Sequence, residues 1–443
     1  MKSYHRLMLV AGVSGMAALS IVTVGQSQTR PRPAAPAATP VQKVTPPIAV
    51  YWMSAQTQTG FGMPSMGGGG GGPDIGAMMR GMMGGGGPVK SLMLQLGSSQ
   101  TNPGPQAEHL PPAALGAGAS LPLWTPERVP PEPREPNQIP PDFEKPRGKL
   151  LIFWGCGERA RPGQPVVIDF AEMAEGRMPA GLSALRGLDV RNMNPPSPSR
   201  NRTYGEWPNT RSRATVPSSG SLVGAHTIRG NYSPQIDFTL EEDQDFLGAL
   251  NITTNAKAPA GHVNLGWNLV GNAQAYFASA IGGGEDETMV MWTSSDAPAA
   301  AFVAPDYMTP GDITRLVNSK ALMGPATKTC AVPKEVIDAM PTGMVSLNAY
   351  GGEANFIYPP RPADPRITWN QQWAVKVRYR ASTGGLLGQD MAAMMGGGGR
   401  EGRRGQAQPP QQQQPGQPAR PPRAPSAADI LRGGILGGIP FPR

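Results

Sequence analysis

The chain has few of the residues from which catalytic and metal sites are usually built. Its 443 residues include only 2 cysteines and 4 histidines, and only 16% are charged and 6% aromatic. No CxxC pair, Cys/His cluster or HExxH motif occurs, so a zinc site lacks ligands at the usual spacing. The glycine tracts follow no Rossmann-type strand and no GxxxxGK motif is present, which excludes dinucleotide and phosphate-loop sites.

Long apolar runs and regular repeats are also missing. After residue 24 no stretch of 18 apolar residues occurs, which excludes a protein with several membrane-spanning helices. The 58 glycines and 51 prolines follow no Gly-X-Y period, which excludes collagen. Together they make up about a quarter of the chain, a level that indicates whole segments without a packed core.

Residues 1–27 have the pattern of an export signal. Lys2 and Arg6 give a basic start, an apolar run extends from Leu7 to Val24, and small residues follow. We therefore expect a periplasmic or secreted protein of a bacterial envelope, with no membrane span after cleavage. The alternative is an uncleaved N-terminal anchor.

The two cysteines, Cys156 and Cys330, fit an oxidising compartment, where an even number of cysteines can pair. A disulfide between them is one interpretation, and two unpaired buried thiols is the other. Cys156 stands between two glycines and is also a candidate nucleophile, although the sequence assigns it no histidine partner.

The net charge of +8 lies mostly outside the segment that can fold. The signal contributes +2, residues 26–48 contribute +3 and residues 381–443 contribute +4, which leaves −1 for residues 49–380. No nucleic-acid partner is expected for a nearly neutral core. Residues 177–213 are an exception, with seven arginines. A solvated connector explains them, and contact with cell-envelope phosphates is the alternative.

The pattern of short apolar runs separated by turns predicts a mainly β fold with two β-sandwich-like modules and a short helical insertion in the second. The expected divisions are a signal (1–27), a Pro/Ala-rich spacer (28–47), a first β module (48–175) with a disordered Gly/Met-rich loop (60–88), an Arg/Pro-rich connector (176–224), a second module (225–381) and a disordered low-complexity tail (382–443).

Three local patterns are specific enough to predict individual elements. Strand-like residues 48–52 and 91–96 flank the Gly/Met-rich loop, which predicts a hairpin with an expanded turn. Thr309, Pro310 and Asp312 predict the start of a helix that extends to about Leu322, and a shorter helix follows at 333–339. Residues 373–380 alternate apolar and polar, which predicts a strand with one buried face and one wet face.

Residues 263–276 resemble the second and third strands of a fibronectin type III domain, because Leu265 and Trp267 precede a Gly-x-Ala turn and a strand with Tyr276. Residues 373–381 resemble the late alternating strand of that family. The resemblance implies that Leu265 and Trp267 face Tyr276 across a sandwich. It also implies an extracytoplasmic recognition or structural module, since the family shares no active site.

The remaining candidates for chemistry are scattered. His109 is expected in a loop, and His226 and His262 at the start of strands, all with structural or exposed roles. The acidic runs 241–245 and 285–287 are expected to be solvated turns. Three methionine pairs in the glycine-rich segments have the MxxM spacing that suits Cu(I), namely Met63/Met66, Met79/Met82 and Met391/Met394, and the candidate Cu(I) ligands are Met78, Met79, Met82 and Met83. Adaptable contact surface is the preferred interpretation of this Gly/Met stretch.

We therefore expect an exported, non-enzymatic envelope or interaction protein that needs no cofactor and binds an unknown envelope or protein partner. A secreted hydrolase is one alternative, and it requires His226 or His262 beside a carboxylate or Cys156. A periplasmic copper-binding protein that uses the methionines is the other.

Overall fold

The computed structural model describes residues 41–60, 87–126, 148–177, 190, 193–302 and 306–389. Over these residues the protein is mainly β, which confirms the fold class predicted from the sequence. The export signal, most of the spacer, residues 61–86 of the Gly/Met-rich loop and residues 390–443 of the tail lie outside the described part. Within the described residues, no helix combines the length and apolar character needed to cross a bilayer.

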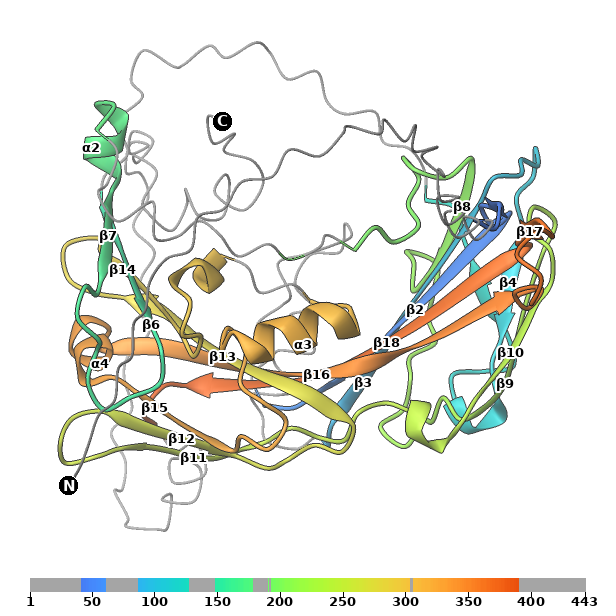
Figure 1. The fold of residues 1–443 in the computed structure, drawn as a ribbon. Coiled ribbons are helices and arrows are strands. Elements are labelled where there is room, and N and C mark those ends of the chain that lie inside the picture. The colour runs from blue at the N-terminus through green and yellow to red at the C-terminus, as the bar shows by residue number, and fades with distance from the viewer. Residues whose placement is uncertain are drawn as a thin grey trace, which may run out of the picture.

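One long twisted sheet of nine strands runs through the molecule (Figure 1). Two of its strand pairs, β6–β14 and β2–β18, are parallel, and the others are antiparallel. The strands in order across the sheet are β7 (Val166–Asp169), β6 (Lys149–Trp154), β14 (Met289–Thr293), β13 (Ala273–Gly283), β16 (Thr342–Tyr358), β18 (Trp373–Leu386), β2 (Ala49–Gln58), β3 (Val89–Ser98) and β8 (Thr203–Trp207).

Two smaller sheets pack against the long sheet, and all three contribute to one apolar core. The four-stranded sheet consists of β10 (Ile236–Leu240), β9 (Gly224–Gly230), β4 (Ala107–Leu110) and β5 (Leu121–Leu123). The three-stranded sheet consists of β11 (Ile252–Lys257), β12 (Val263–Trp267) and β15 (Thr329–Val332). A short parallel ribbon pairs β1 (Val44–Thr45) with β17 (Trp369–Asn370).

Helices are few and short. The α-helices are α2 (Phe170–Ala174), α3 (Pro310–Asn318) and α4 (Lys334–Ala339), and the 3-10 helices are η1 (Ala113–Leu115), η3 (Glu242–Gln244) and η4 (Pro298–Phe302). The helix α3 covers the face of the long sheet opposite to the three-stranded sheet (Figure 1).

Alternation along β13 explains how one strand serves both faces. Phe277 packs with Ile313 and Leu316 of α3, whereas its neighbours Tyr276 and Ala278 belong to the core shared with the smaller sheets. Successive side chains of a strand point to opposite faces. Both faces of this strand are apolar because both are covered.

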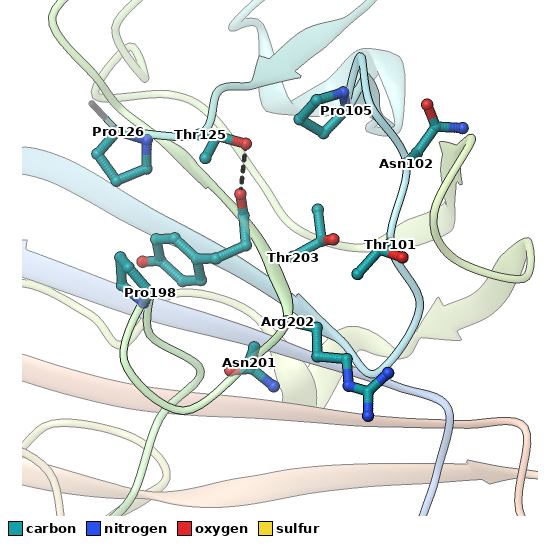
Figure 2. Close-up of a pocket in the computed structure, with 10 residues that line it drawn as sticks. Thr101, Asn102, Pro105, Thr125, Pro126, Pro198, Asn201, Arg202 and Thr203 are labelled. Atoms are coloured by element: carbon teal, nitrogen blue, oxygen red, sulfur yellow. Dashed lines mark hydrogen bonds between the residues drawn. The ribbon is translucent and has the colours of Figure 1, made fainter. Parts of the chain in front are cut away.

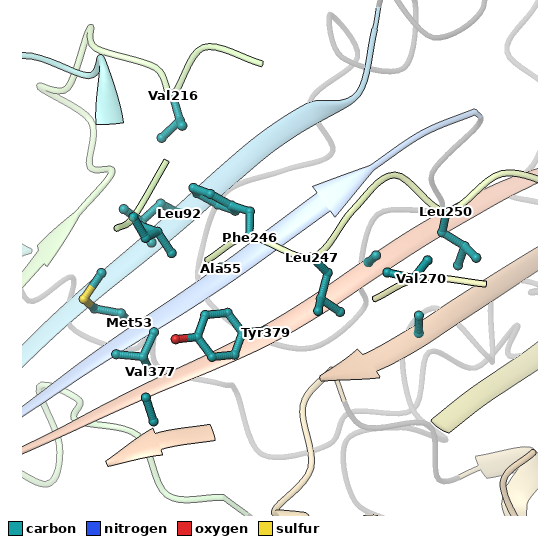
Figure 3. Close-up of a cluster of buried hydrophobic side chains, with 14 of the residues drawn as sticks. Met53, Ala55, Leu92, Val216, Phe246, Leu247, Leu250, Val270, Val377 and Tyr379 are labelled. Carbon is teal, nitrogen blue, oxygen red and sulfur yellow. The ribbon is translucent and has the colours of Figure 1, made fainter. Parts of the chain in front are cut away.

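The segment between η3 and β11 fills the space between the two smaller sheets. Phe246, Leu247 and Leu250 of this segment pack over β2 and β18, near Met53 and Tyr379 (Figure 3). The Thr57 hydroxyl donates a hydrogen bond to the carbonyl oxygen of Leu247 (2.7 Å) and so fixes the segment to β2. The core is thereby continuous from one small sheet to the other.

The hairpin predicted around the Gly/Met-rich loop is confirmed. The strands β2 and β3 pair antiparallel along their full lengths, from Ala49 opposite Ser98 to Gln58 opposite Val89. The insert between them leaves from the end of the pair, where loop length changes the closure entropy only slowly.

The division into two β modules does not coincide with the sheets. The long sheet takes β2, β3, β6 and β7 from the expected first module and β13, β14, β16 and β18 from the expected second one. It also takes β8 from the expected connector, and Tyr204 and Trp207 of that strand are buried. Part of the Arg/Pro-rich stretch therefore belongs to the folded sheet, because two large aromatic residues give it an apolar face.

The last strand, β18, is longer and more buried than the alternation of its residues predicted. It extends through Leu386 into the expected tail, where Ser382 pairs with Asn348 of β16. Trp373, Val375, Val377 and Tyr379 are buried as expected, but Arg380 on the face expected to be wet is only 6% exposed.

Aromatic rings cover this second face of β18. The guanidinium of Arg378 lies 4.9 Å from the ring of Trp52 and 4.4 Å from that of Tyr307. Arg380 forms an ion pair with Asp306 (2.6 Å), and its side chain is buried instead of facing water. Burial lowers the pKa of Arg378. Burial also acts to lower the pKa of Arg380, but electrostatic interactions, among them those with Asp306 and the hydrogen bond to it, outweigh burial and raise that pKa. Cation–π contact explains how these arginines are tolerated below the surface.

The helix predicted at Thr309 begins where expected and ends earlier. Its end at Asn318, rather than near Leu322, coincides with a left-handed backbone at Lys320 (φ 58°). At its start the Thr309 hydroxyl oxygen accepts a hydrogen bond from the backbone N–H of Asp312 (3.2 Å).

Replacing Thr309 by alanine should lower the free energy of unfolding by about 1 kcal/mol, because the first turn of α3 loses its side-chain acceptor. Thr309→Ser keeps that acceptor and is the matched control. Urea unfolding of the three proteins measures the effect, and an equal loss for Ser and Ala would show that the cap contributes nothing.

Candidate functional site

The structure joins the two cysteines. Cys156 lies in the turn after β6 and Cys330 lies in β15, and a disulfide links them with their Cα atoms 5.3 Å apart. The same turn is held by the N–H of Gly157, which donates to the carbonyl oxygen of Ala331 (2.9 Å), and by the indole N–H of Trp292, which donates to that of Gly155 (3.0 Å). In this arrangement neither sulfur is a thiol, so Cys156 offers no nucleophile.

Two histidines meet between the long sheet and the four-stranded sheet. The hydroxyl of Tyr51 (β2) lies 2.7 Å from Nδ1 of His109 (β4), and Nε2 of His109 lies 2.9 Å from Nδ1 of His226 (β9). Nε2 of His226 lies 2.7 Å from the carbonyl oxygen of Leu222, and its ring stacks on Phe238. The prediction that His109 lies in a loop is wrong, because it lies within a fully buried strand position.

The carbonyl at one end fixes the direction of every hydrogen bond in this chain. A carbonyl oxygen only accepts, so Nε2 of His226 carries a proton and donates to Leu222. In the neutral ring Nδ1 of His226 then accepts from Nε2–H of His109, and Nδ1 of His109 accepts from the Tyr51 hydroxyl. All these donors and acceptors are satisfied with both rings neutral.

Burial keeps the three side chains of this hydrogen-bond chain uncharged. It lowers the pKa of His109 well below its ordinary value, with the nearby His226 as the second cause. It also lowers the pKa of His226, against a smaller opposite effect of the Leu222 carbonyl. Burial, followed by Tyr232, raises the pKa of the Tyr51 hydroxyl well above its ordinary value. The three side chains therefore form a neutral link between two sheets.

The other histidine of the described part stands apart from this link. His262 immediately precedes β12 and is 6% exposed. Its Nδ1 has no hydrogen-bond partner within the described residues. The structure thus brings together His109 and His226 and leaves His262 separate.

The first acidic run is partly structural. The Asp245 carboxylate accepts hydrogen bonds from the Ser221 hydroxyl and from the backbone N–H of Leu222, each 2.7 Å long. It thereby positions the residue whose carbonyl accepts from His226. Glu241 and Gln244 form a reciprocal cap of η3.

The second acidic run forms the turn between β13 and β14, where Asp286 and Glu287 have left-handed backbones. In the part of the chain that the structure describes, no three His, Cys, Asp or Glu side chains gather as a metal site would require. The copper candidates Met78, Met79, Met82 and Met83 lie outside the described residues.

A cavity of about 380 Å³ opens where three loop segments meet (Figure 2). The segments follow β3, follow β5 and lead into β8. Two hydroxyls hold its walls together: that of Thr125 donates to the carbonyl oxygen of Tyr204 (2.6 Å), and that of Thr203 donates to the carbonyl oxygen of Gln100 (2.7 Å). The volume falls in the lower range of small-molecule sites.

A glycine of β3 allows the lining residue Asn201 to approach the sheet. The amide of Asn201 lies directly over Gly97 of β3, where an added Cβ would come within 2.4 Å of the Asn201 side chain. The loop before β8 can approach the sheet only because this position carries no side chain. Asn201 also accepts a hydrogen bond from the backbone N–H of Ser197 (3.0 Å), which closes the loop.

Apolar rings and one cation line the cavity. Pro105, Pro126 and Pro198 supply three apolar faces, and the buried Tyr204 borders the cavity from the side of the sheet. Arg202 is the one charged residue among those that line it. The arginine-rich composition of residues 177–213 is a signal for this site, but composition alone cannot place Arg202 beside the loops that follow β3 and β5.

The fibronectin-like residues lie on two facing sheets. Leu265 and Trp267 of β12 and Tyr276 of β13 are buried, and the rings of Trp267 and Tyr276 are 5.9 Å apart. The chain matches no family model, no curated protein and no solved structure. The geometry of the molecule itself is therefore the basis for its function, and the resemblance to fibronectin type III domains stays a prediction.

Proposed function

We propose that this chain is an exported cell-envelope protein that acts by binding a ligand or partner and not by catalysis. The observation that carries the proposal is the state of the groups that the sequence offered for chemistry. Cys156 is in a disulfide, and His109 and His226 are in a closed, neutral and buried hydrogen-bond chain. A general base needs an accessible acceptor with a pKa near the working pH. These two histidines are buried, their pKa values are lowered, and their ring nitrogens are already engaged in hydrogen bonds.

The disulfide supports the extracytoplasmic part of the proposal. Such bonds persist in secreted and periplasmic proteins and are rare in the cytosol. The basic start and apolar run of residues 1–27 have the pattern of a signal that would direct export. The cavity beside β8 supplies a binding site formed by loops on a rigid sheet, the usual arrangement for recognition.

Expression of the full chain in a Gram-negative bacterium tests this proposal. We expect a processed protein in the periplasmic or secreted fraction that begins near residue 28 and has no free thiol. Leu9→Arg, which interrupts the apolar run of the signal, should leave the chain unprocessed and in the cytoplasm. Mass measurement and thiol alkylation of the fractions give the result, and a wild-type chain retained in the cytoplasm with two reduced thiols would refute it.

A further inference from the structure

The polar groups that remain available in the cavity beside β8 can all donate hydrogen bonds. The hydroxyls of Thr125 and Thr203 are used by carbonyl oxygens, and the Asn201 side-chain oxygen is used by Ser197. The Asn201 NH2 group, the Thr101 hydroxyl and the Arg202 guanidinium have no hydrogen-bond partner within the described residues. A cavity that offers mainly donors is suited to a ligand rich in acceptors.

Arg202 is free to take an anion. It is exposed, and within the described residues no carboxylate lies within ion-pair distance of its guanidinium. The nearest acid along the chain, Glu206, accepts a hydrogen bond from the Tyr204 hydroxyl (2.7 Å). That hydroxyl also accepts from Gln95, so the tyrosine offers the cavity no free polar group. Burial, and then the bond to Glu206, raises the pKa of Tyr204.

The surroundings of the cavity are positive. Arg200, Arg211 and Arg213 flank β8, all three are exposed, and no ion pair joins them to a described carboxylate. Arg211 stacks on Trp124 at 4.3 Å, next to the cavity residue Thr125. Charges of one sign around an opening concentrate ligands of the opposite sign there.

We infer that this cavity binds the phosphate group of a small sugar phosphate, with Arg202, Asn201 and Thr101 as donors and the proline rings against the sugar. Arginine pairs with phosphate oxygens through two parallel N–H bonds, and three donor groups match the three terminal oxygens of a phosphomonoester. The apolar rings give the C–H face of a sugar a surface on which to pack. This inference rests on the proposed function as a binding protein and names its ligand class.

Calorimetric titration of the purified full chain with glucose 6-phosphate tests the inference. We expect saturable binding at one site, at least about tenfold tighter than glucose, glucuronate or inorganic phosphate. Arg202→Gln should weaken binding about tenfold or more, and Arg202→Lys should weaken it less because it keeps the charge but not the planar fork. Arg213→Gln, an equal loss of charge outside the cavity lining, is the matched control and should change affinity less than about twofold.

Several results would overturn the inference. Absence of saturation, or an equal loss of affinity in Arg202→Gln and Arg213→Gln, would show that the cavity is not the site. Glucuronate binding as tightly as glucose 6-phosphate would show a carboxylate site, and inorganic phosphate binding as tightly would show that the sugar contributes nothing. Because no described carboxylate forms an ion pair with Arg202, its variants should keep the wild-type circular dichroism spectrum.

The titration and the export experiment fail independently. An exported and oxidised chain that binds no sugar phosphate would overturn the ligand assignment and leave the proposed function standing. A chain that binds the ligand but stays in the cytoplasm with reduced thiols would overturn the proposed export and leave the ligand assignment standing.

Discussion

Removal of the Cys156–Cys330 disulfide is expected to lower the free energy of unfolding by about 2–5 kcal/mol. The bond closes a loop of 174 positions. For a loop of that length the chain-entropy treatment gives about 5 kcal/mol, which is an upper value because the unfolded chain keeps some structure. Urea unfolding of the oxidised chain and of the Cys156→Ala, Cys330→Ala double variant measures the difference as a shift of the midpoint.

Reductant provides the control for this experiment. It should move the midpoint of the wild-type chain toward that of the double variant and leave the double variant unchanged. Equal midpoints for the oxidised chain and the double variant would contradict the expectation, and would mean that the hydrogen bonds around Gly155 and Gly157 hold the turn alone.

Acidification from about pH 7 to about pH 5 is expected to destabilise the fold through His109 and His226. Their pKa values are lowered in the folded state, whereas in the unfolded chain a histidine titrates near about 6.5. Below that pH the unfolded chain binds more protons than the folded one, so the free energy of unfolding falls as the pH decreases. Above it the two histidines contribute no pH dependence. Each contributes at most about 1.4 kcal/mol per pH unit.

Neutral replacements identify the source of this slope. His226→Gln keeps a donor for Leu222 and an acceptor for His109, so it should remove part of the slope, and the double variant with His109→Gln should remove most of it. Tyr51→Phe removes a hydrogen-bond donor but no titrating histidine, so it should lower stability at every pH by about 1–3 kcal/mol and keep the slope. Urea midpoints at a series of pH values give the answer, and an unchanged slope in the double variant would refute this origin.

Local patterns in the sequence were sufficient wherever the relevant contacts are local. Thr309 and Pro310 mark the start of α3 because a cap is made within one turn. The two halves of the β2–β3 hairpin were recognisable because both flank a single insert. The alternation of Trp373, Val375 and Val377 identified the buried face of β18 because period-two patterning requires only the strand itself.

Contacts between distant segments could not be predicted in this way. The parallel pairing of β2 with β18 joins residues 324 positions apart, and neither strand carries a sequence pattern that identifies the other as its partner. His109 and His226 are 117 positions apart and have no motif, so their hydrogen bond was not foreseeable. The burial of Arg380 depends on Tyr307, which comes from another segment and adds an aromatic cover that the alternation cannot reveal.

The pairing of β2 with β18 also determines when the protein can fold. The chain is synthesised from its N-terminus, so β2 has emerged long before its parallel partner Trp373–Leu386 exists. Until then one hydrogen-bonding edge of the β2–β3 hairpin is open, and open edges recruit strands of other chains. Sheets dominated by such distant pairs form slowly. A holding chaperone that shields the hairpin should therefore raise the yield of native protein, and release of the chain before residue 386 is complete should lead to aggregates.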